Sequence, residues 1–251
     1  MATIYQVAER AGVSLSTVSR VLNGKTTVNA TLKAKVEKAM LELNYRPNSV
    51  ARSLATSRSD SVGILVSELN TPFFGDLMQG VESTLRVADK HVIITVGHNN
   101  LETEQDAVEF LISRNCDALI MHAEAMRDED LVALNEKRLP IALVNRQVTG
   151  LENNCIALDN EKGGYLATSH LLELGHKDIA YISGPMKIRD ACHRLKGHKR
   201  ALEEAGVPYN PMLTYEGNYE EEDGKIGLLE LLSRDTPFPA LVCANDWMAS
   251  G

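Results

Sequence analysis

Residues 3–23, TIYQVAERAGVSLSTVSRVLN, are the stretch from which the organisation of the whole chain follows. Thr3 and Gln6 have the spacing of a capping box at the start of a first helix. Gly12 can adopt the left-handed conformation that ends this helix, and Ser14 is a capping residue for a second one. Apolar residues recur at helical spacing on both sides of Gly12. The stretch therefore predicts two short helices joined by a tight turn.

The second helix leaves small and polar side chains outside its apolar stripe of Val18, Val21 and Leu22. These outward residues are Leu15, Ser16, Thr17, Ser19 and Arg20. A helix-turn-helix presents such residues to base edges in the major groove of DNA. The alternative is an ordinary pair of packed helices. The turn at residues 11–13, the cap and the polar set occur together, which favours DNA binding.

The charges of the chain are divided unevenly along its length. The net charge is −8, which alone would argue against a nucleic-acid partner. Residues 1–58, however, hold nine Lys and Arg against three acids, whereas the other residues hold 17 basic and 31 acidic side chains. A basic head on an acidic body is typical of a phosphate-binding module carried by a regulatory domain. No apolar run approaches the roughly 20 residues of a membrane span, and the N-terminus is no signal peptide.

A third helix is predicted over residues 30–44, ATLKAKVEKAMLELN, with Asn29 before it. Its inward positions follow the helical period, and they are Leu32, Val36, Ala39, Met40 and Leu43. Lys33, Lys35 and Lys38 lie on its other sides, either beside DNA phosphates or simply in solvent.

Pro47 ends this helical pattern, and a short segment, residues 48–55 (NSVARSLA), follows before a linker rich in Ser, Thr and Arg. Asn48 can cap the segment as a helix. Two turns are far below the roughly 12–15 residues that are stable alone in water. The segment therefore needs a partner in order to fold, or else it is a plain linker with one apolar contact.

From Val62 onward the pattern changes to an alternation of strands and helices. Continuous apolar runs predict buried strands within residues 61–69, 91–97, 117–123, 140–146, 178–184 and 239–246. Amphipathic stretches predict helices at residues 73–88, 103–115, 128–137, 161–175, 189–206 and 223–234. This alternation is typical of a doubly wound parallel sheet with helices on both faces. Binding sites in such sheets lie at the carboxyl ends of the strands.

The motifs of several function classes are missing from the sequence. It has no GxGxxG after the first strand, no GxxxxGK[ST] and no GxSxG, so no nucleotide cofactor and no enzymatic nucleophile is expected. Cys192, His193 and His198 are the residue types that bind metal ions. One helix would not gather these three on one face, so we expect no metal.

Polar and aromatic side chains follow the predicted strands instead. They are Asn70, Thr71, Phe73 and Phe74, then His122, Asn145 and Arg146, then Asp159 and Asn160 after the apolar run CIAL (residues 155–158), and finally Asn245 and Asp246. Amides, carboxylates and an arginine near an aromatic platform suit the hydroxyls and apolar face of a sugar. Each residue taken singly has a helix cap as its alternative, and for Asp159 the two readings stay equally open.

The pattern AxxAGVSxxTVSRVLN resembles the signature of the LacI/GalR family of bacterial repressors, and the resemblance extends over the whole chain. It implies that the segment PNxxARxLA is a hinge helix that pairs with its twin from a second subunit on the DNA. Leu54 would then wedge into the minor groove and open a base step. The DNA-binding residues implied in this way are Thr3, Leu15, Ser16, Thr17, Ser19, Arg20, Asn23, Asn48, Val50, Ala51 and Leu54.

The stretches LNTPFF, VNRQ, RDACHRLKG and CANDWMASG resemble the sugar-binding fold that this family shares with periplasmic sugar receptors. The match implies that Phe73 and Phe74 pack on a sugar ring, that Arg194 donates to sugar oxygens and that Asp246 accepts from hydroxyls. Thr71, Asn145, Arg146 and Tyr219 complete the implied effector-binding set.

The fold expected from these arguments is an all-α helix-turn-helix head followed by an α/β, periplasmic-binding-protein-like effector domain. Its expected divisions are a DNA-binding domain at residues 1–47, a hinge and linker at 48–59, and two effector subdomains at 60–158 and 159–251. The chain ends where a helix would begin, so we expect the second subdomain to be incomplete and the chain to be a fragment.

The stretches HAEAMRDEDL and NRQVTGLENNCIALDN are most similar to the galactose-operon repressors of the family. Two departures are Thr71, where those proteins usually carry an acid, and the pair Leu15-Ser16, where they generally carry Val-Ala. The resemblance implies a cytoplasmic homodimer that binds a pseudo-palindromic operator under the control of a small sugar. The alternative is a sugar-binding transport or chemotaxis receptor, which would need an export signal and would leave the first 58 residues without a role.

Overall fold

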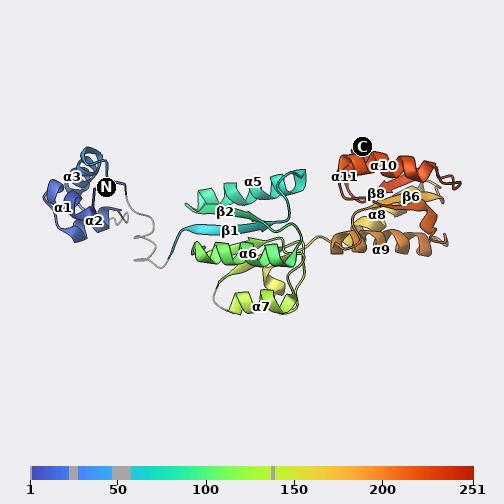
Figure 1. Ribbon diagram of the computed structural model, residues 1–251, viewed down its shortest axis with the longest axis horizontal. Helices are drawn as coiled ribbons and strands as arrows, with labels where there is room; N and C mark the ends of the chain where they lie inside the picture. Colours follow the sequence, from blue (N-terminus) through green and yellow to red (C-terminus); the bar gives the residue numbers. More distant parts are fainter. Residues whose placement is uncertain (1, 23–27, 47–57, 137–138) are drawn as a thin grey trace.

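The computed structural model describes residues 2–22, 28–46, 58–136 and 139–251. Its first unit consists of three helices, α1 (Ile4–Ala11), α2 (Leu15–Leu22) and α3 (Ala30–Glu42) (Figure 1). The capping box at Thr3 and Gln6 is present, since the Thr3 hydroxyl accepts from the Gln6 backbone while the Gln6 side chain accepts from the Thr3 backbone. Gly12 ends α1 with a φ of 65°, in the left-handed region. The predicted helix-turn-helix is confirmed.

A small apolar core holds these three helices together. Val7 of α1, Val18 of α2 and Val36 of α3 are fully buried in it, together with Ala39. Leu32 differs from its predicted inward position, because it lies near the start of α3 and remains 36% exposed. The core is therefore centred on the middle of each helix, and residues nearer the helix ends, such as Ile4 and Leu22, pack against it while partly buried.

The second unit, called here the first α/β unit, is a five-stranded parallel sheet in the order β2-β1-β3-β4-β5. The strands are β1 (Ser61–Val66), β2 (His91–Val96), β3 (Ala118–Met121), β4 (Ile141–Val144) and β5 (Cys155–Ile156). Helix α5 (Pro72–Val87) covers one face through Phe74, and helices α6 (Leu101–Ser113) and α7 (Asp128–Glu136) cover the other through Leu111 and Leu131 (Figure 1). A short 3-10 helix (Glu152–Asn154) precedes β5.

The third unit, the second α/β unit, is a three-stranded parallel sheet in the order β7-β6-β8. Its strands are β6 (Ile179–Ser183), β7 (Thr214–Glu216) and β8 (Ala240–Cys243). Its helices are α8 (Asn160–Glu173), α9 (Arg189–Glu204), α10 (Glu221–Leu232) and α11 (Asp246–Ser250), with a 3-10 turn at Pro211–Leu213. Helices α8 and α9 approach closely at Gly164 and Gly197, where a Cβ atom would lie 2.0 Å and 1.9 Å from backbone oxygens of the facing helix.

The strand orders determine where a ligand can be bound. In the first sheet the chain moves from β1 to β2 on one side and returns to β3 on the other, so the switch point lies between β1 and β3. In the second sheet it lies between β6 and β8 for the same reason. The segments that follow these strands, residues 67–71, 122–127, 184–188 and 244–246, are thus the expected site.

The α/β class and the parallel sheets agree with the sequence prediction. The strands β5 and β7 were not predicted, because they have only two and three residues; β5 lies in the short apolar run CIAL (residues 155–158), and β7 carries no apolar run. Within the described ranges, no helix is both long and apolar enough to cross a membrane.

Candidate functional site

The outward surface of α2 carries the residues that sequence reasoning placed there. Leu15 is 38% exposed, and Ser16 and Arg20 are exposed beside it. The Ser14 hydroxyl lies 2.9 Å from both the Ser16 and the Thr17 hydroxyl, and it accepts from the Thr17 backbone N–H at 3.3 Å. A cluster of hydroxyls therefore marks the N-terminal end of α2, which is the end that a recognition helix directs at DNA.

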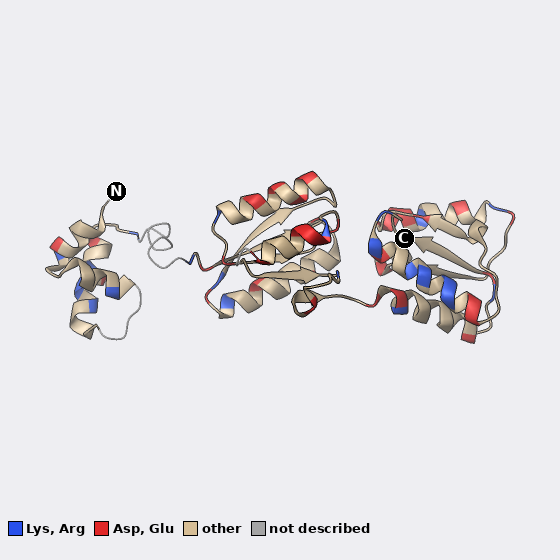
Figure 2. Cartoon of the chain, turned by 90° about the horizontal axis from the view of Figure 1, so that it is seen from below, with Lys and Arg blue, Asp and Glu red and all other residues tan. Residues whose placement is uncertain are grey.

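Both signs of charge occur on the three-helix unit next to the N-terminus (Figure 2). Arg10 Nε donates to Glu42 Oε2 at 2.7 Å, and this hydrogen bond holds the pKa of Glu42 below its usual value. On α3, Lys33 and Lys38 lie 3.8 Å and 4.0 Å from Glu37 and Glu42. Asn23, Asn48, Val50, Ala51 and Leu54 lie outside the described residues.

An aromatic pair begins helix α5 beside the end of β1. Thr71 caps the helix by accepting from the Phe74 backbone at 3.5 Å. The Phe73 ring is 45% exposed, whereas Phe74 is buried and packs edge-on against both Phe73 and His122, with ring centroids 5.1 Å and 5.0 Å apart. Phe73 is thus the ring that a ligand can reach, while Phe74 supports it.

A hydrogen-bonded chain links the ends of three adjacent strands. Ser67, after β1, donates its hydroxyl hydrogen to Asn99 after β2, at 2.5 Å. Its oxygen also lies 2.8 Å from His122 Nδ1, after β3, so Nδ1 donates and Nε2 is left as an acceptor. Burial lowers the pKa of His122 to about 4, which keeps the ring neutral at physiological pH. Ser67 and Asn99 were not predicted, because only their positions after strands distinguish them.

Arg146 reaches the site less directly than predicted. Its guanidinium donates to the carbonyl of Ala123, to the carbonyl of Met126 at 2.7 Å and to Asp128 at 2.5 Å. Its side chain is buried, and Nε is the one guanidinium nitrogen without a hydrogen-bond partner. These contacts direct Arg146 at the loop after β3.

Asp190, in the first turn of α9, connects the two α/β units. Both Asn145, after β4, and Asn160, at the start of α8, donate side-chain hydrogens to its carboxylate, Asn160 at 2.8 Å. Arg194 then donates to Asn160 Oδ1 at 2.7 Å and to the Ala244 carbonyl at 2.6 Å. Burial raises the pKa of Asp190, and Arg194 opposes this. Asp190 was not among the predicted residues, although Asn145 and Arg194 were.

Tyr219 lies near Arg194, whose guanidinium carbon is 5.9 Å from the centre of the Tyr219 ring. Its hydroxyl is buried without a hydrogen-bond partner, and burial raises its pKa to about 12. Gly184 makes room for the ring, because a Cβ atom there would lie 2.1 Å from Tyr219 Cζ. The buried Tyr219 hydroxyl is therefore a hydrogen-bond donor without an acceptor.

The remaining predicted residues lie at helix starts. Asn245 caps α11 by accepting from the Met248 backbone, and it also donates to the Tyr219 carbonyl, both at 2.9 Å. Asp246, next to it, is exposed. Asp159 accepts from the Lys162 backbone at 2.9 Å, so it is a helix cap.

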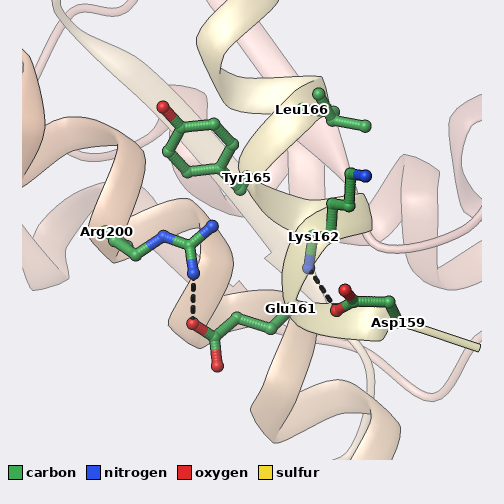
Figure 3. Close-up of a pocket in the computed structure, with 6 residues that line it drawn as sticks. All are labelled: Asp159, Glu161, Lys162, Tyr165, Leu166 and Arg200. Atoms are coloured by element: carbon green, nitrogen blue, oxygen red, sulfur yellow. Dashed lines mark hydrogen bonds and ion pairs between the residues drawn. The ribbon is translucent and has the colours of Figure 1, made fainter.

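Among the described residues, the α/β units carry at least two hollows. One of about 520 Å³ runs from Asn70 of the first unit to Trp247 and Lys225 of the second. The other, of about 420 Å³, lies over α8 and α9 (Figure 3). In this hollow Arg200 Nη1 donates to Glu161 at 2.6 Å, whereas Arg200 Nε is buried without a hydrogen-bond partner. The first hollow adjoins the strand ends described above, and the second does not.

A metal site is not formed by the candidates that the sequence offered. His198 is buried against Thr168, with Nδ1 at 2.9 Å from its hydroxyl, whereas Cys192 is exposed and donates to the Met186 carbonyl. Among the described residues, no group of three or more His, Cys, Asp or Glu could hold a metal ion.

Two family models match the chain. The model of bacterial regulatory proteins of the lacI family matches residues 3–48, and that of periplasmic binding proteins and the sugar-binding domain of the LacI family matches residues 59–251. The chain is 40% identical over its whole length to the HTH-type transcriptional regulator GalR of Escherichia coli (strain K12), of which it covers 73%. It is 34% identical to the ribose operon repressor of Haemophilus influenzae, again over its whole length and covering 75% of that protein.

Solved structures resemble it closely. The lac repressor dimer bound to operator and the anti-inducer ONPF superposes with a TM-score of 0.86 at 31% identity, covering 99% of this chain and 75% of that one. The complex of the transcriptional regulator CelR with cellobiose has a TM-score of 0.64 at 30% identity, with the same coverage.

Proposed function

The chain belongs to the lacI family of bacterial regulatory proteins, and from this membership we propose that it is a repressor whose affinity for operator DNA is controlled by a galactose-like sugar. The membership itself makes it a DNA-binding transcription regulator with a sugar-binding domain, and not an enzyme. As a bacterial regulator it would act in the cytoplasm, where the DNA lies.

The DNA contacts are assigned to α2 and to the segment that follows α3. Leu15 and Ser16 would contact base edges, Leu15 through a thymine methyl group for instance. Thr3, Thr17, Ser19, Arg20 and Asn23 would position the helix on the phosphates. The hinge residues Asn48, Val50, Ala51 and Leu54 would bind the minor groove in a homodimer on a pseudo-palindromic operator. The dimer named in the lac repressor structure supports this arrangement.

The sugar is assigned to the space between the two α/β units. The observation that carries this proposal is the bridge at Asp190, which accepts from Asn145 of one unit and Asn160 of the other. A ligand there would meet the exposed Phe73 ring, the unpartnered Tyr219 hydroxyl and the donors of Arg194. Further contacts are proposed for Thr71, Phe74, Asn145, Arg146 and Asp246.

Galactose is favoured over other sugars by the 40% identity to GalR. The ribose operon repressor and the cellobiose-bound CelR are less similar, at 34% and 30% identity. The sugar would control binding by preferring one arrangement of the two units, which in turn separates the hinge segments. A coupling free energy of about 1–3 kcal/mol changes operator affinity roughly 5–150-fold.

The test is a gel-shift titration with a duplex selected by the protein from a randomised pool, repeated at several salt concentrations with D-galactose, D-ribose or cellobiose. Wild-type protein should bind in a salt-dependent way, and D-galactose should weaken binding roughly 5–150-fold. Arg20→Ala should weaken binding and reduce the slope of log K against log salt by about 0.9 if Arg20 contacts one phosphate.

Arg114→Ala is the matched control, since Arg114 lies over the Phe110 ring on helix α6, far from α2 in sequence. It should leave both affinity and slope unchanged. Absence of salt-dependent DNA binding would overturn the repressor proposal and favour a sugar receptor. A response to ribose or cellobiose alone would overturn only the choice of sugar.

A further inference from the structure

The loop between β3 and α7, residues 122–127, is held by a buried carboxylate from a different part of the chain. Glu104 lies in the first turn of α6 and is fully buried. Its two oxygens accept from the backbone N–H groups of Glu124 at 3.0 Å, Ala125 at 3.1 and 3.0 Å, and Met126 at 2.8 Å. Three consecutive amides thus converge on one side chain.

A buried cation, the Arg146 guanidinium, binds the carbonyl groups of the same loop. Arg146 donates to the carbonyls of Ala123 and Met126, and its third contact is with Asp128, directly after the loop. Glu104 and Arg146 therefore act on complementary groups of one short backbone segment. Removing either side chain would leave buried backbone groups without hydrogen-bond partners. This destabilises a fold more than removing both partners of a hydrogen bond together.

The backbone of the first sheet provides space for Glu104. A Cβ atom at Gly97, after β2, would lie 2.6 Å from Glu104 Cγ and 3.2 Å from Leu65 Cδ1. The φ of Gly97 is not in the left-handed region, so the absence of a side chain there serves the close approach alone. The Glu104 side chain therefore occupies space that is free because position 97 is a glycine.

The loop presents acidic side chains to the second α/β unit. Asp190 and Arg189 of α9 act on the Glu124 carboxyl, whose pKa is raised mainly by burial and then by Asp190, while Arg189 lowers it. Asp128, which Arg146 holds at 2.5 Å, lies 3.9 Å from Arg189. Both carboxyls therefore face the same turn of α9 that carries the Asp190 bridge.

We propose that Glu104 is a positioning residue for sugar binding: it fixes the loop at residues 122–127 so that Glu124 and Asp128 meet α9 in the arrangement that the bound sugar selects. The inference rests on the proposed function, since it concerns the same cleft. Glu104 touches neither the cleft nor α9 in the described contacts, so its effect passes through the loop.

The experiment compares wild type with Glu104→Gln and Gly97→Ala. Glutamine keeps the size of Glu104 but offers one acceptor oxygen, and it directs an NH₂ group at the loop amides. Alanine at position 97 displaces Glu104 without changing its charge. Glu109→Gln is the control, because Glu109 is exposed on the same helix.

Two measurements are made on each full-length chain. Hydrogen exchange reports the protection of the amides of Glu124, Ala125 and Met126. The fluorescence of Trp247, the one tryptophan of the chain, which lines the larger hollow, reports titrations with D-galactose, D-ribose and cellobiose.

Both variants should lose protection at the three amides and bind the sugar roughly tenfold more weakly, as expected when a residue outside the site changes the arrangement of the groups around it. The control should match wild type in both measurements. Faster exchange with an unchanged sugar dissociation constant would overturn the inference and leave Glu104 as a stabilising group only. Unchanged exchange would overturn it as well. If the wild-type protein bound no sugar, the proposed function itself would be contradicted. This outcome is distinguishable from the others because it does not depend on the variants.

Discussion

Asn145, at the end of β4, donates a side-chain hydrogen to Asp190, in the first turn of α9, and so joins the two α/β units by one hydrogen bond. Asn145 has a φ of 64°, in the left-handed region, which turns the chain sharply at this point. The other Asp190 oxygen already accepts from Asn160 within the second unit. A ligand that separates or draws together the two units must therefore act on the Asn145 bond.

Asn145→Ala should weaken sugar binding by about tenfold, because one charge-assisted hydrogen bond is lost from the arrangement that the sugar needs. Fluorescence titration of Trp247 measures the change. Asn153→Ala, at an exposed position of the same unit, should have no effect. Equal dissociation constants for wild type and Asn145→Ala would show that the bridge has no part in sugar binding.

Tyr219→Phe should change stability and binding in opposite directions. Without sugar, it removes a buried hydroxyl that has no partner, so the free energy of unfolding should rise by roughly 1 kcal/mol. With sugar, it removes a donor that the raised pKa keeps protonated, so affinity should fall. Urea denaturation and sugar titration of the same variant test both. A loss of stability together with unchanged affinity would contradict the assignment of Tyr219 to the sugar site.

Gly197→Ala should destabilise the second α/β unit by about 3 kcal/mol, because its Cβ would overlap the Glu161 carbonyl oxygen and force α8 and α9 apart. The matched control is Gly163→Ala on α8, where a Cβ atom meets nothing within 4 Å. That change should stabilise the helix by about 0.5–1 kcal/mol. Circular dichroism during urea denaturation distinguishes the two.

His198 makes stability depend on pH. Burial lowers its pKa from 6.5 to about 4, so between these values the unfolded chain binds a proton that the folded chain refuses. Stability therefore falls as pH is lowered through this window. Glu124 and Asp190 have raised pKa values and oppose this trend, but they are common to wild type and variant.

His198→Phe removes this one group, and the ring can still pack beside Tyr181. Its loss of unfolding free energy between pH 7 and pH 5 should be smaller than that of wild type, by on the order of 2 kcal/mol. Urea denaturation at both pH values measures the difference. Parallel pH dependences would contradict a neutral, buried His198.

The helix-turn-helix was predictable because its signals are local. Thr3 with Gln6, Gly12 and Ser14 act within a few residues of themselves, and the structure contains each cap as predicted. The longer strands were predictable from apolar runs for the same reason. β5 and β7 were not, since their pairing with β4 and β6 depends on residues distant in the chain.

In the candidate site, too, the residues with local signals were predictable and those that depend on distant contacts were not. Phe73 and Arg194 could be selected because they follow strands or stand in a recognisable motif. Asp190 and Glu104 are acids in the first turns of helices, where an acid usually interacts with the helix end alone. Only the folded chain places Asn145 beside one of them and three loop amides beside the other.

The three-helix unit uses different residues for its apolar core and for its outward surface. Its core is built from Val7, Val18 and Val36, whereas Leu15 and Ser16 lie outside that core. Exposed substitutions usually change stability by no more than about 0.5 kcal/mol. Substitutions at these two positions should therefore cost the scaffold little stability, so the DNA sequence that α2 would contact can change without a compensating change in the core.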